Sequence, residues 1–406
     1  MITSAKIQRL SSQKKPELLA PAGDLERAKI AFIYGADSVY VGGNILSLRA
    51  RASTFTLEDI AEASRFAHDL NKRLYVTVNI VPHDEDLIYL TDYLLRLNDI
   101  GVDALICSDP FVIEQALAHT TIPVHLSTQA SPTNSLLINY WHDRGIKRVV
   151  LARECTLEEI RVIRKNTHAE LEVFIHGGMC VSYSGRCTLS NYMTGRDANR
   201  GGCAHSCRWK YRLSRDGIQE TDDFWMASKD LETLAIIPDL FDLSIDSLKI
   251  EGRMKSIHYI ATVTKTYRQV IDDFAGGQLR PTADYKAMMM KAENRASAPG
   301  FLNGVPDESG QINSDICTGP VQNFIGIVRE ILPDQRQALI ETRNAFTILD
   351  KLEVFSPDRP DTILDLKTIK TEDGTPRTCS TRPLSRLLIE TPTQMKPYDI
   401  LRKVIE

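Results

Sequence analysis

The chain has 406 residues, of which 43% are hydrophobic and 25% are charged. Both fractions are ordinary for a globular protein that folds around a large core. Its 49 basic and 53 acidic side chains leave a net charge of −4, which excludes a uniformly basic nucleic-acid coat but allows a local basic patch. The sequence contains no apolar run long enough for a transmembrane helix. Residues 1–15 lack the apolar core of a signal peptide, so we expect a mobile tail on a cytoplasmic protein without a membrane partner.

After Pro16 the sequence alternates between short apolar runs, typical of buried strands, and helical segments. The predicted strands cover residues 17–20, 38–41, 74–79, 104–107, 124–127, 148–152, 171–176 and 247–250. The predicted helices between them cover residues 25–34, 57–70, 87–100, 111–118, 135–143 and 157–166. Eight strands with mostly helical connections predict a (β/α)8 barrel of the TIM type over residues 16–275. A doubly wound open sheet is the alternative, but the glycine-rich phosphate turn of that fold is missing.

The pattern changes after the barrel. Residues 257–274 continue as a helix, and residues 276–320 combine a probable helical segment at 283–292 with a linker rich in Gly, Pro, Asn and Ser. From about residue 321 short β-type runs follow one another, separated by turns such as Asp373-Gly374. The predicted runs are 324–331, 337–342, 351–355, 365–370 and 387–389. Residues 321–406 are therefore expected to form a small all-β domain, a barrel or a sandwich.

Four cysteines lie in a cysteine-rich insertion, residues 177–225, between the seventh and eighth predicted strands. Cys180, Cys187, Cys203 and Cys207 follow the pattern C-x6-C-x15-C-x3-C. Four nearby thiols are typical of a metal site. Only the second pair has the short spacing of a zinc knuckle, whereas an iron–sulfur cluster accepts thiolates from irregular loops. Iron–sulfur, zinc and unligated thiols therefore remain open at this point.

The same insertion is basic and aromatic. Its cations between residues 180 and 215 are Arg186, Arg196, Arg200, Arg208, Lys210, Arg212 and Arg215, against the single acid Asp197, and Tyr183, Tyr192, Trp209 and Tyr211 are interleaved with them. Such a segment can pair with phosphates and stack on bases. It can equally compensate the negative charge of a thiolate-bound cluster, or be an ordinary solvated loop.

Side chains at the carboxyl ends of barrel strands are the prime candidates for chemistry. Arg153 and Arg253 suit an acidic small molecule, because a guanidinium binds a carboxylate or phosphate through two parallel hydrogen bonds. Lys249 and Glu251 lie in the same charged stretch and are further candidates for substrate binding. His176 is the candidate acid–base residue. Structural salt bridges and a hydrogen-bonded core histidine are the alternatives.

The stretch from Glu172 to Ser190, EVFIHGGMCVSYSGRCTLS, resembles the signature of the peptidase U32 (collagenase-like) family. The resemblance extends to Glu17–Asp24, to Gly35–Gly43 and to Leu248–Lys255, and the C-terminal module is similar to the small β-barrel domain of the family. Several members of this family are oxygen-independent hydroxylases that carry a [4Fe–4S] cluster. The layout of this chain is most similar to the branch that acts on the wobble uridine of tRNA and uses prephenate.

The resemblance implies a site and a function. It matches Cys180, Cys187 and Cys203 to cluster cysteines of the family and makes Cys207 the natural fourth. Some relatives place a cysteine where this chain has Glu232, which leaves the fourth ligand less certain. The expected function is tRNA hydroxylation with prephenate or a similar acid as co-substrate, with a partner subunit of the same family as a further possibility. The alternatives are a collagenase-like peptidase and a zinc-stabilised RNA-binding module without catalysis.

Overall fold

The structure is a computed structural model that describes residues 14–48, 55–219, 223–292, 295–312, 324–332, 336–390 and 394–404. The described residues form two compact units. The first takes in the residues up to 287 together with 295–312, and the second takes in 288–292 together with 324–404. Most of the predicted mobile tail, residues 1–13, lies outside the described residues. No helix in the described ranges is long and apolar enough to cross a membrane.

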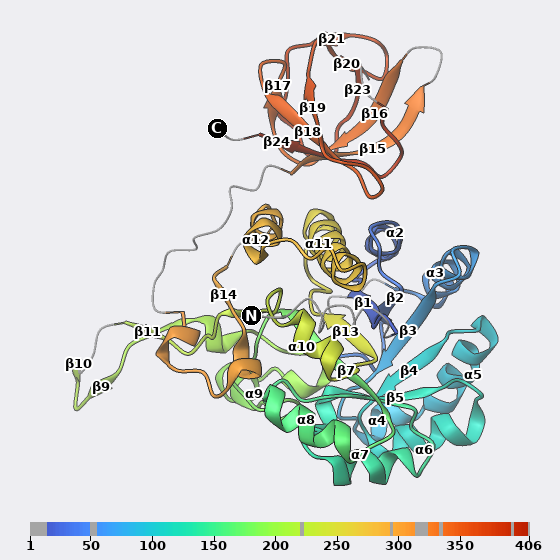
Figure 1. The fold of residues 1–406 in the computed structure, drawn as a ribbon, viewed down its shortest axis with the longest axis vertical. Helices are drawn as coiled ribbons and strands as arrows, with labels where there is room; N and C mark the ends of the chain where they lie inside the picture. Colours follow the sequence, from blue (N-terminus) through green and yellow to red (C-terminus); the bar gives the residue numbers. More distant parts are fainter. Residues whose placement is uncertain are drawn as a thin grey trace. The chain divides into compact units, whose positions relative to one another are not determined.

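A closed barrel of parallel strands forms the centre of the first unit (Figure 1). Its strands are β1 (Glu17–Pro21), β2 (Ser38–Gly42), β3 (Arg73–Val78), β4 (Ala104–Cys107), β5 (Val124–Leu126), β6 (Arg148–Val150), β7 (Glu170–Gly177) and β13 (Ser247–Ile250). Strand β13 pairs in parallel with both β1 and β7, which closes the barrel. The predicted (β/α)8 barrel is confirmed, and the open sheet is excluded.

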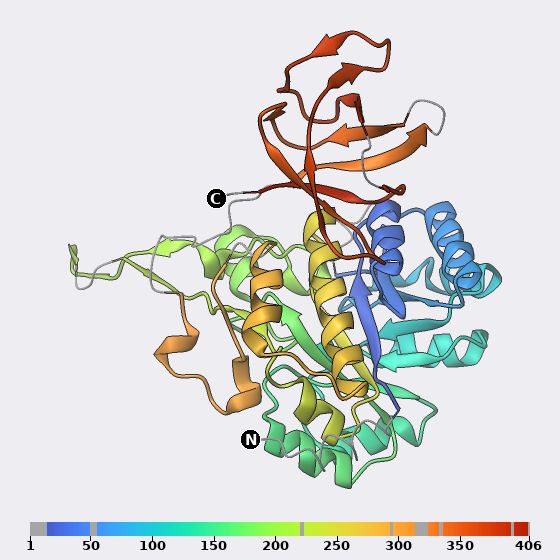
Figure 2. The same cartoon turned by 45° about the horizontal axis from the view of Figure 1, so that its top comes forward.

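Helices surround this barrel on the outside (Figure 2). They are α2 (Leu25–Ile33), α3 (Leu57–Asp69), α4 (Asp84–Leu87), α5 (Leu90–Ile100), α6 (Pro110–His119), α7 (Ser135–His142), α8 (Leu157–Lys165), α10 (Ile237–Asp242) and α11 (Ile257–Ala275). Thr156 and Glu159 form the predicted capping box at the start of α8. The helix predicted over residues 87–100 is present as α5, which begins three residues later because the separate short helix α4 ends at Leu87. Helix α10 was not predicted.

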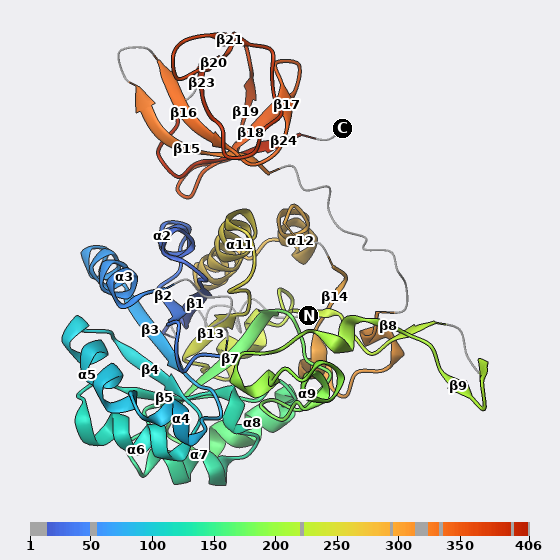
Figure 3. The same ribbon diagram turned by 180° about the vertical axis from the view of Figure 1, so that it is seen from behind.

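The cysteine-rich insertion leaves the barrel after β7 (Figure 3). It contains α9 (Leu189–Thr194), the 3-10 turns η2 (Ala198–Arg200) and η3 (Ser206–Arg208), and two short antiparallel pairs, β8 (Lys210–Tyr211) with β11 (Phe224–Trp225) and β9 (Ser214–Arg215) with β10 (Ile218–Gln219). Two further strands extend the sheet beyond β7. Strand β12 (Asp230–Glu232) runs antiparallel to β7, and β14 (Ser297–Ala298) runs parallel to β12. Neither was predicted.

Buried charged side chains lie in the barrel interior toward the amino-terminal ends of the strands. Glu17 on β1 accepts hydrogen bonds from Arg148 on β6, with an oxygen–nitrogen distance of 2.8 Å. Glu172 on β7 is fully buried and lies 2.8 Å from the ammonium of Lys249 on β13. Despite burial, which favours the neutral acid, Lys249 and Arg148 lower the pKa of the Glu172 carboxyl. Charged pairs between neighbouring strands and across the barrel therefore hold the interior together, as well as apolar contacts.

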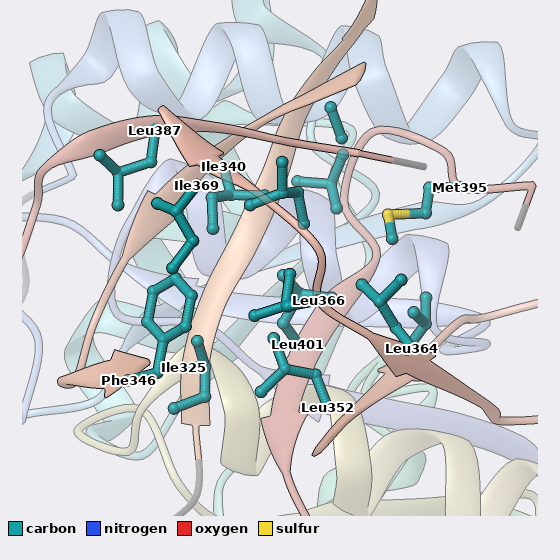
Figure 4. Packing of buried hydrophobic residues seen from close by; sticks show 14 residues of the cluster. Ile325, Ile340, Phe346, Leu352, Leu364, Leu366, Ile369, Leu387, Met395 and Leu401 are labelled. Carbon is teal, nitrogen blue, oxygen red and sulfur yellow. The ribbon is translucent and has the colours of Figure 1, made fainter. Parts of the chain in front are cut away.

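The second unit is an antiparallel half-barrel, which confirms the predicted small all-β domain. Its eight-stranded sheet has the order β19–β18–β24–β15–β16–β23–β20–β21. The bounds are β15 (Phe324–Leu332), β16 (Gln337–Thr342), β18 (Lys351–Phe355), β19 (Thr362–Asp365), β20 (Ile369–Thr371), β21 (Pro376–Arg377), β23 (Arg386–Glu390) and β24 (Ile400–Lys403), with a separate pair, β17 (Phe346–Thr347) and β22 (Cys379–Ser380). Ile340, Phe346, Leu352 and Leu401 meet in its core (Figure 4). The single strand predicted over residues 365–370 is wrong, because β19 ends and β20 begins within it.

The predicted helix over residues 283–292 is present as α12 (Thr282–Met290). The linker that follows is described only in part. It includes β14 and the turns η4 (Gly300–Asn303) and η5 (Glu308–Gly310), and residues 313–323 lie outside the described ranges. The proposed boundaries of the linker therefore stay a prediction.

Removing one partner of the buried Glu172–Lys249 pair should destabilise the barrel. We expect Lys249→Met to lower the free energy of unfolding by about 3–5 kcal/mol, because it leaves a carboxylate buried without its nearest counter-charge. Urea unfolding followed by far-ultraviolet circular dichroism measures the change. The matched control is Glu158→Gln, which breaks an exposed pair with Arg161 on α8 and should cost less than about 1 kcal/mol. Equal effects of the two substitutions would contradict the stabilising role of the buried pair.

Candidate active site at the barrel mouth

The predicted site residues outside the cysteine cluster come from three neighbouring strands. Arg153 follows β6, His176 lies near the end of β7, and Glu251 and Arg253 follow β13. Strand β7 pairs in parallel with β6 on one side and with β13 on the other. These side chains therefore share the carboxyl-terminal mouth of the barrel, where active sites of this fold are built.

Arg253 reaches across the mouth to the far strands. Its Nη1 donates hydrogen bonds to the hydroxyl oxygens of Ser47, at 3.0 Å, and Thr77, at 3.1 Å. Its guanidinium also lies 6.0 Å from the ring centre of Tyr40 on β2. Arg253 is almost fully buried. Its position is therefore set by contacts with β2, β3 and the loop after β2, which leaves it little rotamer freedom to lose when a ligand binds.

Arg153 is held on the other side of the mouth. Its guanidinium stacks on the ring of Phe174, with a distance of 4.0 Å to the ring centre, and donates to the carbonyl oxygen of Gly178. The ammonium of Lys249 lies 5.4 Å from the same ring centre and 4.5 Å from that of Tyr40. Lys249 therefore lies among these rings, buried and paired with Glu172, and its predicted role in substrate binding stays a prediction.

Glu251 shapes the start of the insertion. Its carboxylate accepts a hydrogen bond from the backbone N–H of Gly178 at 3.2 Å. Gly177 has a φ of +108°, and a β-carbon there would lie 2.3 Å from the carbonyl oxygen of Glu251. Only glycine fits this turn, both for its backbone conformation and for its closeness to β13. The Gly-Gly pair after His176 thus directs the chain from β7 into the insertion.

His176 lies just below this turn and is buried. Its ring packs between those of Tyr259 and Tyr267, with centre distances of 5.8 and 5.5 Å, and Nδ1 is 3.4 Å from the Tyr267 hydroxyl. Burial, together with the charge of Lys255, lowers the pKa of His176 to about 3. The imidazole is therefore neutral near pH 7. Its geometry suits a hydrogen-bonding group better than a proton donor, and its predicted catalytic role stays a prediction.

The cysteine loop is anchored to the neighbouring strand ends. Glu154, which follows β6, accepts hydrogen bonds from the backbone N–H and the hydroxyl of Ser184, both at 2.9 Å. The hydroxyl of Ser131, in the loop after β5, donates to the carbonyl oxygen of Ser184. These contacts position the segment from Cys180 to Cys187 over the barrel.

The four predicted thiols approach one another. Cys180 is exposed, and Cys187, Cys203 and Cys207 are partly exposed. Burial raises the pKa of the Cys207 thiol, Arg208 opposes this, and the charges of the other three cysteines raise it further. Cys207 therefore lies within electrostatic reach of each of the other three thiols. As arranged in the described residues, no group of three or more His, Cys, Asp or Glu side chains could hold a metal ion.

Glu232 occupies the position at which some relatives were expected to have a cysteine, and its carboxylate contacts two other residues. Glu232 on β12 accepts a hydrogen bond from the backbone N–H of Leu234 at 2.7 Å and pairs with Lys286 at 3.2 Å. Both contacts of Glu232 are with residues outside the cysteine-rich insertion. They agree with the expectation that Cys207 completes the set of four thiols, which stays a prediction.

Sequence reasoning missed Asp230, the buried acid at the junction of the mouth and the insertion. It begins β12, which pairs with the end of β7, and it lies 3.7 Å from Arg208 and 3.7 Å from Lys255. The available signal was a charged residue inside the short run Ser228–Leu231. Nothing in that run indicates that β12 turns back along β7.

A cavity of about 590 Å³ lies at the opposite, amino-terminal end of the barrel. Its charged lining is largely paired internally, as in the Arg73–Glu17 and Arg268–Asp37 contacts at 3.1 and 2.9 Å. In barrels of this type that face usually serves stability. The cavity is therefore not a second candidate for the active site.

Comparison with known proteins shows the family. The model of peptidase family U32 matches residues 23–312, and the model of its C-terminal domain matches residues 321–402. The tRNA hydroxylation protein P1 of Bacillus subtilis is 41% identical over 401 residues, which cover 96% of this chain and 95% of the relative. The tRNA hydroxylation protein P of Escherichia coli is 34% identical over 396 residues, covering 84% of this chain and 86% of the relative. A collagenase of Porphyromonas gingivalis is 34% identical over 306 residues, covering 71% and 72%.

These matches confirm the resemblance read from Glu172–Ser190, from the three further stretches and from the C-terminal module. The protein belongs to peptidase family U32.

Proposed function

We propose that this protein is an RNA-modifying enzyme that hydroxylates a nucleoside of tRNA, with the wobble uridine as the expected target. The names of the relatives from Bacillus subtilis and Escherichia coli support tRNA hydroxylation. The proposal makes tRNA the macromolecular partner and the cytoplasm its place of action. A partner subunit of the same family stays a further expectation.

One structural observation carries the proposal. The four thiols belong to the insertion that leaves the barrel mouth after β7, and this mouth presents two arginines, Arg153 and Arg253. A peptidase needs a nucleophile with a base or a metal-bound water, whereas this mouth combines thiols with groups that bind anions. That combination suits a redox reaction with an acidic co-substrate.

We propose that Cys180, Cys187, Cys203 and Cys207 hold a [4Fe–4S] cluster. The donor set fits, because four thiols on irregular loops are the usual ligands of such a cluster. When bound, the cluster supplies one-electron redox chemistry or a Lewis-acidic iron. Zinc is the alternative occupant, and it would make the insertion structural.

The mouth residues then bind and orient an acidic co-substrate such as prephenate. Arg253, fixed by Ser47 and Thr77, and Arg153, stacked on Phe174, supply guanidinium donors to its carboxylates. Glu251 supports the turn at Gly178. The buried rings of Tyr40 and Phe174 exclude water from beneath the bound acid, which strengthens its electrostatic contacts.

Metal analysis tests the cofactor. Protein purified without oxygen should contain about four irons and four sulfides per chain and absorb broadly near 400 nm. Cys180→Ala or Cys187→Ala should abolish the band, whereas Cys379→Ala, which removes an exposed thiol of the C-terminal unit, should leave it unchanged. A colourless protein with one zinc per chain would contradict the cluster.

Kinetics test the co-substrate site. Arg153→Gln removes a charged donor, so the KM for prephenate should rise about 10- to 100-fold, with a smaller effect on kcat. The assay is formation of hydroxylated nucleoside in a tRNA transcript, measured by mass spectrometry at several prephenate concentrations. Arg161→Gln, on the outer helix α8, is the control of equal charge change. An unchanged KM in Arg153→Gln would refute its role as a carboxylate ligand.

The similarity to a collagenase favours a second candidate, peptide hydrolysis. Incubation with gelatin and with unmodified tRNA under the same conditions separates the two. We expect hydroxylated nucleoside and intact gelatin. Cleavage of gelatin that persists after iron is removed, with no change in the tRNA, would establish the peptidase instead.

A further inference from the structure

Three basic side chains from separate segments converge on Asp230. Arg208 belongs to the insertion and follows Cys207, Lys255 lies in the loop after β13, and Arg295 precedes β14. Their side-chain nitrogens lie 3.7, 3.7 and 3.9 Å from the carboxylate oxygens of Asp230. All four residues belong to the first unit. The cluster thus joins the cysteine loop to the barrel mouth.

The Asp230 carboxylate does not form hydrogen bonds of normal length with the three basic side chains. The distances exceed those of good hydrogen bonds, and Oδ1 of the buried Asp230 accepts none within the described part of the chain. The Asp230 side chain is 9% exposed, whereas the three basic side chains remain 21–33% exposed. The acid is thus enclosed, and the cations can be reached from solvent.

The charge of the cluster is unbalanced. Three cations face Asp230 and the nearby Glu251, whose carboxylate already accepts the Gly178 N–H. Three like charges so close together repel one another unless an anion completes the group. Three cations against two carboxylates leave one excess positive charge, which an oxyanion from solvent would balance.

We propose that Arg208, Lys255 and Arg295 form an oxyanion site that binds a backbone phosphate of the RNA substrate, while Asp230 holds the three cations together when the site is empty. The inference rests on the proposed function. A phosphodiester fits better than a second small acid, because the exposed ring of Trp209 follows Arg208 and offers a base-stacking surface beside the phosphate. In this proposal Arg153 and Arg253 bind the co-substrate, and the three cations around Asp230 bind the RNA.

Salt-dependent binding tests the site without any catalysis. Affinity of the full-length protein for an unmodified tRNA transcript is measured at several salt concentrations, for the wild type, Lys255→Gln, Arg295→Gln and the control Arg161→Gln. Each site variant should weaken binding several-fold and lower the slope of log affinity against log salt by about 0.7–1. Arg161→Gln makes the same change of net charge on an outer helix and should keep the wild-type slope. Equal slopes in all four proteins would overturn the proposal.

Asp230→Asn separates a binding site from a purely structural cluster. If Asp230 competes with phosphate for the three cations, its neutral amide should tighten tRNA binding several-fold. A structural clamp predicts the opposite, weaker binding together with a lower melting temperature. Weaker binding by Asp230→Asn that retains the wild-type melting temperature would also refute the competition.

A prephenate-binding measurement distinguishes an RNA phosphate from a small acid as the oxyanion that this site binds. Prephenate binding, measured by equilibrium dialysis, should be unchanged in Lys255→Gln and Arg295→Gln. If these variants lose prephenate and retain tRNA, the site belongs to the small acid and the phosphate assignment fails. If the hydroxylation assay fails while the site variants still lower the salt slope of tRNA binding, the proposed function is refuted and the phosphate site is not.

Discussion

The carboxyl end of β7 is the constraint on which the rest of the site depends. Most barrel strands pair with two parallel neighbours, but β7 also receives β12 in antiparallel orientation at His176 and Gly177. The register with β13 shifts at the same level, between Lys249 and Ile250. The end of β7 is paired with both β12 and β13, so the turn that follows it has a defined direction. That turn carries the cysteine loop, and its geometry requires glycine at position 177.

The barrel interior is organised by charge along its axis. Glu17 and Arg148 pair near the amino-terminal end, and Glu172 and Lys249 pair above them. The arginines at the mouth come next, contacting aromatic rings and hydroxyls. Buried charges are tolerated only when each has a partner of opposite sign, and the charges at these two levels are paired with one another. The proposed binding of an acidic co-substrate is therefore placed at the mouth, where Arg153 and Arg253 contact an aromatic ring, hydroxyls and a backbone carbonyl.

The parts of the structure that could be predicted from the sequence are those set by local pattern. The barrel strands are continuous apolar runs, and the capping residues Thr156 and Glu159 specify a helix start within four residues. Strand β12 was missed because it is three residues long and is stabilised by pairing with β7 and β14, which are far away in sequence. One strand was predicted over residues 365–370 because apolar residues such as Leu366 and Ile369 follow one another there, although residues 366–368 belong to no strand.

The features of the candidate site also fall into those that could be predicted from the sequence and those that could not. The four cysteines and Arg153, Glu251 and Arg253 could be found from residue type and strand position, because those features are local. The environment of each residue could not. Lys249 and Arg253 are both cations of one short segment, yet Lys249 points to the buried Glu172 and Arg253 to hydroxyls at the mouth. Asp230 has no distinguishing neighbour in sequence, and its role depends on cations that lie 22 residues before it and 25 and 65 residues after it in the chain.

Arg208 connects the two halves of the site. Burial raises the pKa of the adjacent Cys207 thiol, and the charge of Arg208 opposes this rise. The same guanidinium belongs to the cation group around Asp230. An anion bound to that group and the Cys207 thiol would therefore draw on the positive charge of the same side chain, so one residue joins the cysteine loop to the proposed phosphate site.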